Sequence, residues 1–212
     1  MKLYDYFRSS AAFRVRIALN LKGLQYDYVT KALLKNEHRA ADYLALNPQG
    51  LIPTLEVDGT VISQSLAIVE YLDEVQPQPH LLPADPLARA QVRSMALAIA
   101  CDIHPLNNLR VLNYLRRDLG QNDAGVNTWY RHWVAEGFRG LELQAAKHSA
   151  AGRYCFGDSL SLADVCLVPQ MYNARRFKCD LTPFPKLTAI STHLETLPAF
   201  DAARPEAQPD AR

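Results

Sequence analysis

Short runs of alternating apolar and polar residues fill about the first 75 positions of the chain. A helix is expected where Phe13, Ile17 and Leu21 recur on one face, and a hairpin turn is expected at Asp58-Gly59. In order, the predicted elements are a strand at 3–7, a helix at 10–22, a strand at 26–30, a short helix before 47, strands at 54–57 and 61–63, and a helix at 65–75. The order βαβαββα predicts a small mixed α/β domain.

Prolines interrupt this pattern between 76 and 86, where four of them exclude a helix interior or a central strand. Beyond this stretch the apolar residues recur with helical spacing, and helices are predicted at 88–118, 127–147, 162–177 and 186–198. We therefore expect an α/β domain over 1–78, a linker over 79–87 and an all-α domain over 88–212. The tail from Arg204 is expected to be extended or loose.

The composition excludes several classes of partner. The 212 residues include 23 basic and 22 acidic side chains, so nothing indicates binding to nucleic acid or to an anionic membrane. No apolar run approaches the roughly 20 residues that cross a bilayer, and the N-terminus lacks the apolar core of a secretory signal. A soluble, cytoplasmic protein is expected. The four cysteines fit neither a paired metal motif nor a disulfide framework, so we expect reduced thiols and no metal site.

The pair Ser9-Ser10 lies between the first predicted strand and the first predicted helix. On the plainer interpretation Ser10 caps that helix. Alternatively, a hydroxyl here donates a hydrogen bond to a thiolate, which the helix dipole also stabilises. Lowering a thiol pKa by two units requires roughly 2.7 kcal/mol of preference for the anion. One charge-assisted hydrogen bond and the dipole can supply that amount.

Two further features of the N-terminal domain are candidate binding groups. The dipeptide Ile52-Pro53 precedes a predicted strand. Taken alone it favours an ordinary trans proline, whereas a cis bond would turn the Ile52 backbone towards an extended peptide ligand. The pair Gln64-Ser65 opens the helix after the hairpin. There Ser65 can cap the helix, and the free backbone N–H groups favour a carboxylate.

The combination of these features resembles one family. The run from Ser9 to Leu19 is similar to the signature of the zeta-class glutathione transferases, Ser-Ser-Cys-x-Trp/His-Arg-Val-Arg-Ile-Ala-Leu. Other segments similar to that class are 47–55 around its cis-proline, 64–68 at its glutamyl-binding turn, 158–164 at its helix capping box, 167–170, 173–177 and 208–210. The resemblance spans nearly the whole chain. The chain departs from the signature at Ala11, where the family has cysteine, and at Phe13.

The resemblance implies the glutathione transferase fold, an α/β thioredoxin-like N-terminal domain plus an all-α C-terminal domain, with glutathione as cofactor. It implies that glutathione contacts the following residues: Ile52 beside a cis Pro53 at the cysteinyl backbone, Gln64 and Ser65 at the γ-glutamyl carboxylate, Gln49 near the glycyl end, and Ser9 near the sulfur. Because Ala11 removes the family's protein thiol, we expect either that the nucleophile is the sulfur of glutathione or that the activity differs from the family's.

The class includes glutathione-dependent cis–trans isomerases of maleylpyruvate and maleylacetoacetate, in which thiolate addition makes a double bond single and lets it rotate. Conversion of maleylpyruvate to fumarylpyruvate, in gentisate-type aromatic catabolism, is the preferred interpretation, since Ala11 departs from the usual maleylacetoacetate pattern. Both substrates are keto acids with two carboxylates, which the planar fork of arginine binds well. The candidate substrate-binding residues are Arg8, Arg110 and Arg176.

Ser9, Arg8 and Arg176 are the catalytic candidates. His104 and Asn108 share a face of the first long helix of the C-terminal domain, where Pro105 is expected to produce a kink, and they are candidates for contact with glutathione.

Three other functions remain open: a maleylacetoacetate isomerase of tyrosine catabolism, a general transferase or dehalogenase that consumes glutathione, and a binding module without activity. A homodimer is expected by resemblance only.

Overall fold

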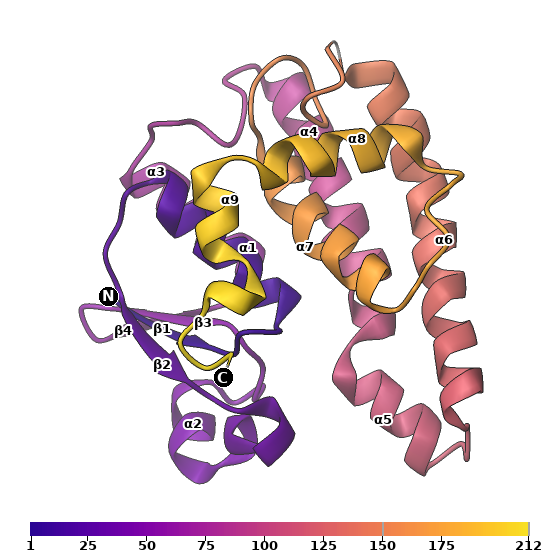
Figure 1. Cartoon of the computed structure of the whole chain (residues 1–212). Helices are drawn as coiled ribbons and strands as arrows, with labels where there is room; N and C mark the ends of the chain where they lie inside the picture. Colours follow the sequence, from indigo (N-terminus) through magenta and orange to yellow (C-terminus); the bar gives the residue numbers. More distant parts are fainter. Residues whose placement is uncertain (150, 212) are drawn as a thin grey trace. The chain divides into compact units, whose positions relative to one another are not determined.

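A four-stranded mixed sheet organises the first part of the chain in the computed structural model, which describes residues 1–149 and 151–211 (Figure 1). The strand order is β2-β1-β3-β4. Strand β1 (Lys2–Asp5) pairs in parallel with β2 (Asp27–Thr30), and antiparallel with β3 (Thr54–Val57), which forms a hairpin with β4 (Thr60–Ser63). The helices of this sheet-containing part are α1 (Ser10–Leu21), α2 (Ala41–Leu46), α3 (Ser65–Val75) and α9 (Pro198–Ala203). The predicted order βαβαββα and the thioredoxin-like fold are confirmed.

The chain divides into two units, and the division differs from the predicted boundaries at the C-terminus. Unit 1 comprises Met1–Leu81 together with Thr196–Arg212, and unit 2 comprises Leu82–Glu195. Helix α9 packs against α1, so the C-terminal segment belongs with the sheet and not with the predicted all-α domain 88–212. The last position, Arg212, lies outside the described residues.

Helix α1 is buried on almost every side, which its sequence pattern does not indicate. Every residue from Ser10 to Leu19 is buried, because α3 and α9 both pack against this helix. Two of these residues are arginines, and Arg16 is fully buried in an ion pair with Asp5, at 2.7 Å between Nη1 and Oδ1. Burial raises the pKa of Asp5, and the guanidinium of Arg16 opposes that rise.

The tail is ordered through residue 211, contrary to the prediction of a loose segment from Arg204. After α9 the chain forms a short 3₁₀ turn, Pro205–Ala207. The buried side chain of Gln208 then donates from Nε2 to the carbonyl oxygens of Ala202 and Arg204, at 2.9 Å each. Arg16 also donates from Nε to the carbonyl of Ala203. These hydrogen bonds fix the backbone of the tail on unit 1.

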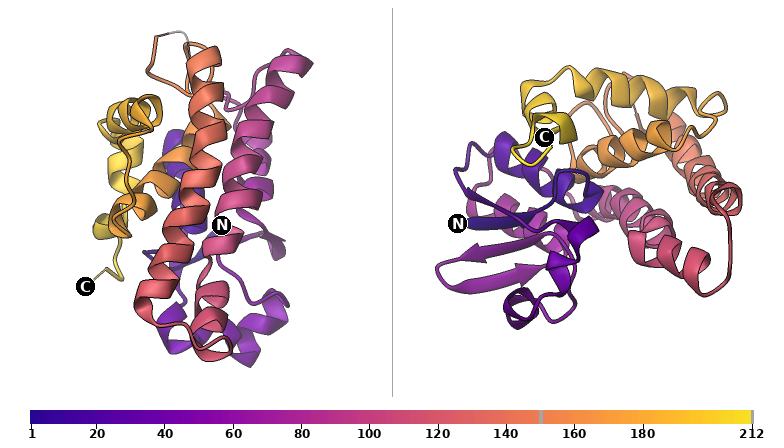
Figure 2. Two further views of the ribbon diagram at one scale, coloured as in Figure 1. Left: turned by 90° about the vertical axis from the view of Figure 1, so that its right-hand side faces the viewer. Right: turned by 60° about the horizontal axis from the view of Figure 1, so that its bottom comes forward.

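Unit 2 is helical. Its helices are α4 (Pro86–Leu97), α5 (Leu109–Arg117), α6 (Asp123–His148), α7 (Leu162–Arg176) and α8 (Pro185–Glu195), and α6 runs the length of the unit (Figure 2). The continuous helix predicted at 88–118 is wrong, because a π-helical turn at Ala98–Ile103 and a 3₁₀ turn at Pro105–Asn107 separate α4 from α5. Proline has no N–H and clashes with the preceding turn, so Pro105 interrupts the helix and does not merely kink it.

The predicted capping box of unit 2 is confirmed at the start of α7. The carboxylate of Asp164 is fully buried and accepts hydrogen bonds from the backbone N–H and hydroxyl of Ser161, at 2.8 Å each, and from the backbone N–H of Cys155 at 2.7 Å. Burial raises the pKa of Asp164, and these hydrogen bonds oppose the rise. The carboxylate thus links the helix start to the preceding loop.

Candidate functional site

Ser9 forms the N-cap of α1, in extended conformation, and its hydroxyl oxygen accepts a hydrogen bond from the backbone N–H of Ala12 at 3.2 Å. The expectation that Ser10 caps the helix is wrong, because Ser10 is already the first helical residue and is buried. Ser9 is only partly buried. Its hydroxyl therefore lies at the positive end of the helix dipole while remaining accessible.

The Ile52-Pro53 peptide bond is cis. The residues before it are held by a buried polar cluster, in which the carbonyl of Leu51 accepts from the hydroxyl of Tyr43 at 2.7 Å and from Nδ2 of Asn47 at 2.9 Å. Burial raises the pKa of Tyr43, so its hydroxyl stays a neutral donor. The strand ladder begins at Thr54, which leaves the backbone of Ile52 outside the sheet register.

The start of α3 differs in detail from the expectation. Gln64 is the N-cap and makes no side-chain capping hydrogen bond, while Ser65 is the first helical residue. Gln64 has a φ of 71°, a backbone conformation that non-glycine residues adopt rarely and that recurs at functional sites. Its exposed side chain donates from Nε2 to Oε1 of Gln49 at 2.9 Å. The structure therefore brings Gln49 and Gln64 together.

Arg14 is a residue of this region that the sequence patterns did not single out. It is almost completely buried and donates from Nη1 to the hydroxyl of Ser65 at 3.2 Å. The guanidinium places a full positive charge beside the first turn of α3, where the backbone N–H groups already favour an anion. The available signal for Arg14 was the run Arg14-Val15-Arg16 inside a predicted helix. The run did not by itself indicate burial, because arginine is rarely buried.

Arg8 lies in the turn before Ser9 and is partly buried. Its guanidinium donates to the hydroxyl of Tyr6 at 3.0 Å and its Cζ lies 4.9 Å from the centre of the Phe7 ring. Stacking on an aromatic ring restricts the side chain without neutralising its charge. Arg8 is therefore a preordered cation next to Ser9 in sequence.

In unit 2, His104 and Asn108 lie close together although no continuous helix joins them. Nδ2 of Asn108 is 3.5 Å from Nε2 of His104. Asn108 is the N-cap of α5, and its Oδ1 accepts from the backbone N–H of Arg110 at 3.2 Å. The side chain of Arg110 is exposed. The two side chains are thus close, as predicted, but the continuous helix on which that prediction was based is absent.

Arg176 ends α7 and is exposed, with its Cζ 5.2 Å from the centre of the Phe177 ring. Two residues of α6 hold Phe177 in place. The ring of Tyr130 stacks on it at 3.6 Å between centroids, and Nε of Arg131 donates to its carbonyl at 3.0 Å. The residue after Arg176 is therefore held firmly while the guanidinium itself stays accessible.

Neither a metal cluster nor a membrane span is found within the described ranges. Residues 1–149 and 151–211 contain no group of three or more His, Cys, Asp or Glu side chains arranged to hold a metal ion. None of the described helices has the length and apolarity that a bilayer crossing demands. Ala11, where the resembling family has cysteine, is buried in α1.

The chain is similar to proteins of one family over its whole length. Residues 1–74 match the family model described as glutathione S-transferase, N-terminal domain. The chain is 53% identical over 212 residues to the probable maleylacetoacetate isomerase of Vibrio cholerae, a match that covers 99% of this chain and 97% of the relative.

Two solved structures are similar in both fold and sequence. A holo maleylpyruvate isomerase, a bacterial glutathione-S-transferase of the zeta class, matches with a TM-score of 0.98 and 48% identity over 100% of both chains. A maleylacetoacetate isomerase from Methylobacterium extorquens AM1, with bound malonate and GSH, matches with a TM-score of 0.95 and 40% identity over 100% of both chains.

Proposed function

This chain belongs to the zeta class of the glutathione transferase family, and on that premise we propose that it is a glutathione-dependent isomerase that converts maleylpyruvate to fumarylpyruvate. The observation that carries the proposal is the position of Ser9 at the N-cap of α1. Its oxygen accepts the N–H of Ala12. A hydroxyl also has one hydrogen to donate, and here that hydrogen would bind a thiolate held above the helix start.

The groups of unit 1 fit a bound glutathione. The first turn of α3, with Arg14 buried beside Ser65, suits the γ-glutamyl carboxylate. The backbone of Ile52, outside the sheet register and next to cis Pro53, suits the extended cysteinyl unit. We assign Gln64 and Ser65 to the glutamyl end, and Gln49, which already contacts Gln64, to the glycyl end.

The contribution of the protein is to hold and activate a sulfur that it does not itself supply. Bound glutathione supplies a thiolate that adds reversibly to the conjugated double bond, which permits rotation about it. Ser9 stabilises the thiolate by one charge-assisted hydrogen bond, and the dipole of α1 adds to it. Together these two effects supply roughly 2–3 kcal/mol, enough to lower a thiol pKa by about two units.

Substrate carboxylates require cations, and three arginines are assigned to them. Arg8 is ordered by Tyr6 and Phe7. Arg110 and Arg176 have exposed side chains on helices whose ends are well fixed. We assign Arg176 the main carboxylate contact, because Phe177 is anchored by Tyr130 and Arg131.

His104 and Asn108 are assigned to contact with the tripeptide, since both offer polar atoms on one partly buried surface. We further propose a homodimeric, cytoplasmic enzyme, a state that sedimentation velocity would test directly.

Maleylacetoacetate is the second candidate substrate, because the Vibrio cholerae relative, at 53% identity, is named as a probable isomerase of that compound. The absence of a thiol at Ala11 favours maleylpyruvate. One assay separates the candidates: each cis substrate is followed by ultraviolet absorbance, with and without catalytic glutathione. We expect faster turnover of maleylpyruvate and no net loss of glutathione. Stoichiometric consumption of glutathione would instead indicate a transferase.

A matched pair of variants tests the carboxylate site. Arg176→Ala is expected to raise KM for the dicarboxylate by roughly 10- to 100-fold, the loss of a hydrogen bond between charged groups. Arg175→Ala is the control, because Arg175 is engaged by Glu195 and Ser191 on α8. If both variants showed the same kinetics as the unaltered enzyme, Arg176 would have no part in binding.

A further inference from the structure

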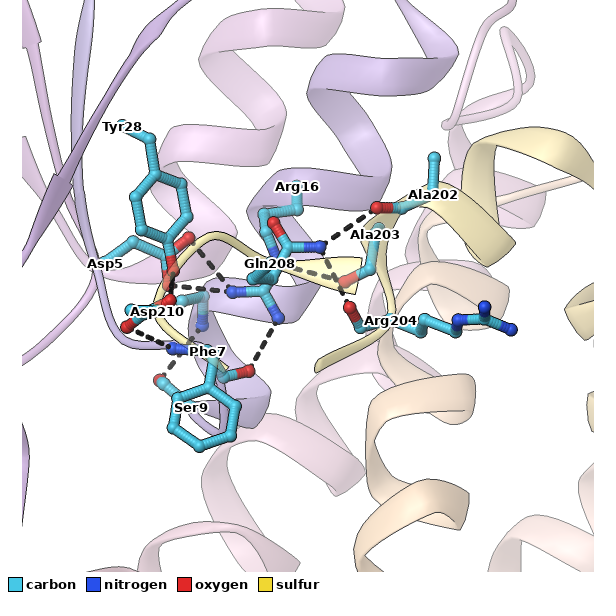
Figure 3. A network of polar contacts seen from close by, with 11 residues as sticks. Asp5, Phe7, Ser9, Arg16, Tyr28, Ala202, Ala203, Arg204, Gln208 and Asp210 are labelled. Carbon is cyan, nitrogen blue, oxygen red and sulfur yellow. Dashed lines mark hydrogen bonds and ion pairs between the residues drawn. The ribbon is translucent and has the colours of Figure 1, made fainter. Parts of the chain in front are cut away.

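The backbone of Phe7 is held from both sides by charged side chains (Figure 3). Its N–H donates to Oδ2 of Asp210 at 3.2 Å, and its carbonyl accepts from Nη2 of Arg16 at 2.9 Å. Phe7 lies inside a turn in which the backbone N–H of Ser9 donates a hydrogen bond to the carbonyl of Tyr6 at 2.8 Å. The two contacts to Phe7 therefore fix the loop that delivers Ser9 to the start of α1.

Asp210 is itself firmly placed although it lies near the end of the described chain. Its Oδ1 accepts a hydrogen bond from the hydroxyl of Tyr28 on β2 at 2.6 Å. Burial raises the pKa of Tyr28, so the phenol stays protonated and remains a donor. The buried Gln208 fixes the backbone just before Asp210. One carboxylate thus joins the sheet, the tail and the turn before Ser9.

We propose that Asp210 is a positioning residue of the reaction: by holding the N–H of Phe7 it sets the place of the Ser9 hydroxyl opposite the sulfur of glutathione. The inference rests on the proposed function, in which Ser9 stabilises the thiolate. A hydrogen bond to an anion depends steeply on distance and angle, so a small shift of the turn weakens it.

The charge of Asp210 and its proposed positioning role predict opposite changes in the pKa of the bound thiol. As a nearby negative charge, its carboxylate disfavours a thiolate, so removal of the charge alone would lower the pKa of the bound thiol. As a positioning group it favours the thiolate, so removal of the whole side chain raises that pKa. Asp210→Asn keeps an oxygen that can accept from Phe7, whereas Asp210→Ala keeps none.

The experiment measures the pKa of the thiol of enzyme-bound glutathione, from the ultraviolet absorbance of the thiolate against pH, in the full chain and its variants. Asp210→Ala is expected to raise this pKa by about one unit, a roughly tenfold loss of thiolate at fixed pH, and to lower kcat more than it raises KM. Asp210→Asn should restore most of the original value.

Asp201→Asn is the matched control, because the side chain of Asp201 forms an exposed ion pair with Arg204 in the same C-terminal segment. It should leave the thiol pKa unchanged. Should Asp210→Ala fail to fold, Tyr28→Phe tests the same contact by removing the anchor of the carboxylate, and it too should raise the thiol pKa.

The outcomes separate this inference from the proposed function. An unchanged or lowered thiol pKa in Asp210→Ala, while Ser9→Ala raises it, overturns the positioning role alone. An Asp210→Asn variant as defective as Asp210→Ala also overturns it. An unchanged pKa in Ser9→Ala overturns both this inference and the assignment of Ser9. A normal pattern of thiol pKa values without isomerase activity overturns the proposed reaction and leaves the positioning role intact.

Discussion

Gly50 offers the sharpest test of how the loop that we propose binds glutathione is built. It is buried between Gln49 and the cis-proline dipeptide, with a φ of 58°. A Cβ at this position would lie 2.9 Å from the carbonyl oxygen of His38, 3.0 Å from Nη1 of Arg39 and 3.0 Å from a methyl group of Leu44. The contact with a backbone oxygen is closer than real Cβ atoms allow, so Gly50→Ala must displace the loop.

The expected magnitude has two parts. An L-residue in the left-handed region costs about 1–2 kcal/mol, and overpacking of a well-packed site costs about 1–3 kcal/mol. Gly50→Ala should therefore destabilise the protein by about 2–5 kcal/mol, which lowers Tm by roughly 4–20 °C for a chain of this size. Because the loop that carries Gln49 moves, the affinity for glutathione should fall about tenfold or more.

Gly59→Ala is the control. Gly59 is in the β3–β4 hairpin turn, has a φ of 80°, and has no atom within 4 Å of an added Cβ. It should show the backbone cost alone, a Tm lower by roughly 2–8 °C, with unchanged affinity for glutathione. Scanning calorimetry gives Tm and titration calorimetry gives the affinity. If Gly50→Ala matched Gly59→Ala in both quantities, the close packing of this loop would have no functional role.

Three further predictions concern unit 2. Asp164→Ala should destabilise the protein by about 3–5 kcal/mol, because it leaves buried donors without a charged acceptor; an unchanged Tm would contradict this. Asn108→Ala removes the cap of α5 and should cost about 1 kcal/mol, or roughly 2–4 °C in Tm; a loss as large as that of Asp164→Ala would show a wider role. Iodoacetamide at pH 8 should modify the exposed Cys101 first, because burial raises the pKa of Cys179 to about 11; peptide mass spectrometry showing Cys179 labelled earlier would refute this.

The elements of unit 1 could be predicted because their signals are local. The hairpin turn at Asp58-Gly59 depends on backbone conformations that few residues adopt, and both residues have the expected positive φ. The capping box of Ser161 and Asp164 spans three residues, so it too could be identified from the sequence alone. Gln64 was a candidate because of its place at the start of a helix, and Gln49 was one by family resemblance; the structure places the two side chains in contact.

The features that were missed depend on partners far away in the chain. Arg16 is buried because its acceptors include the carbonyl of Ala203, 187 residues later, and no periodicity along α1 can reveal such a contact. The ordered tail was missed for the same reason, since Asp210 binds groups on β2 and in the turn before α1. Between 98 and 108 the apolar residues keep their helical spacing although the α-helix is interrupted, because Ile99 and Ile103 stay buried in the π turn. The spacing therefore did not reveal the interruption.

The return of the C-terminal segment to unit 1 has a consequence for how the protein is made. A ribosome releases the sheet, α1 and α3 early, but the residues that cover α1 and bind Arg16 come last. Until 196–211 have been synthesised, the pair of Arg16 and Asp5 lacks the segment that packs over α1 and accepts from Arg16. Unit 1 therefore stays incomplete while the whole of unit 2 is translated. A fragment that stops at Leu81 should therefore expose the α9-binding face of α1 and aggregate, whereas joining 196–211 to it through a short flexible linker should restore a folded, independently stable unit.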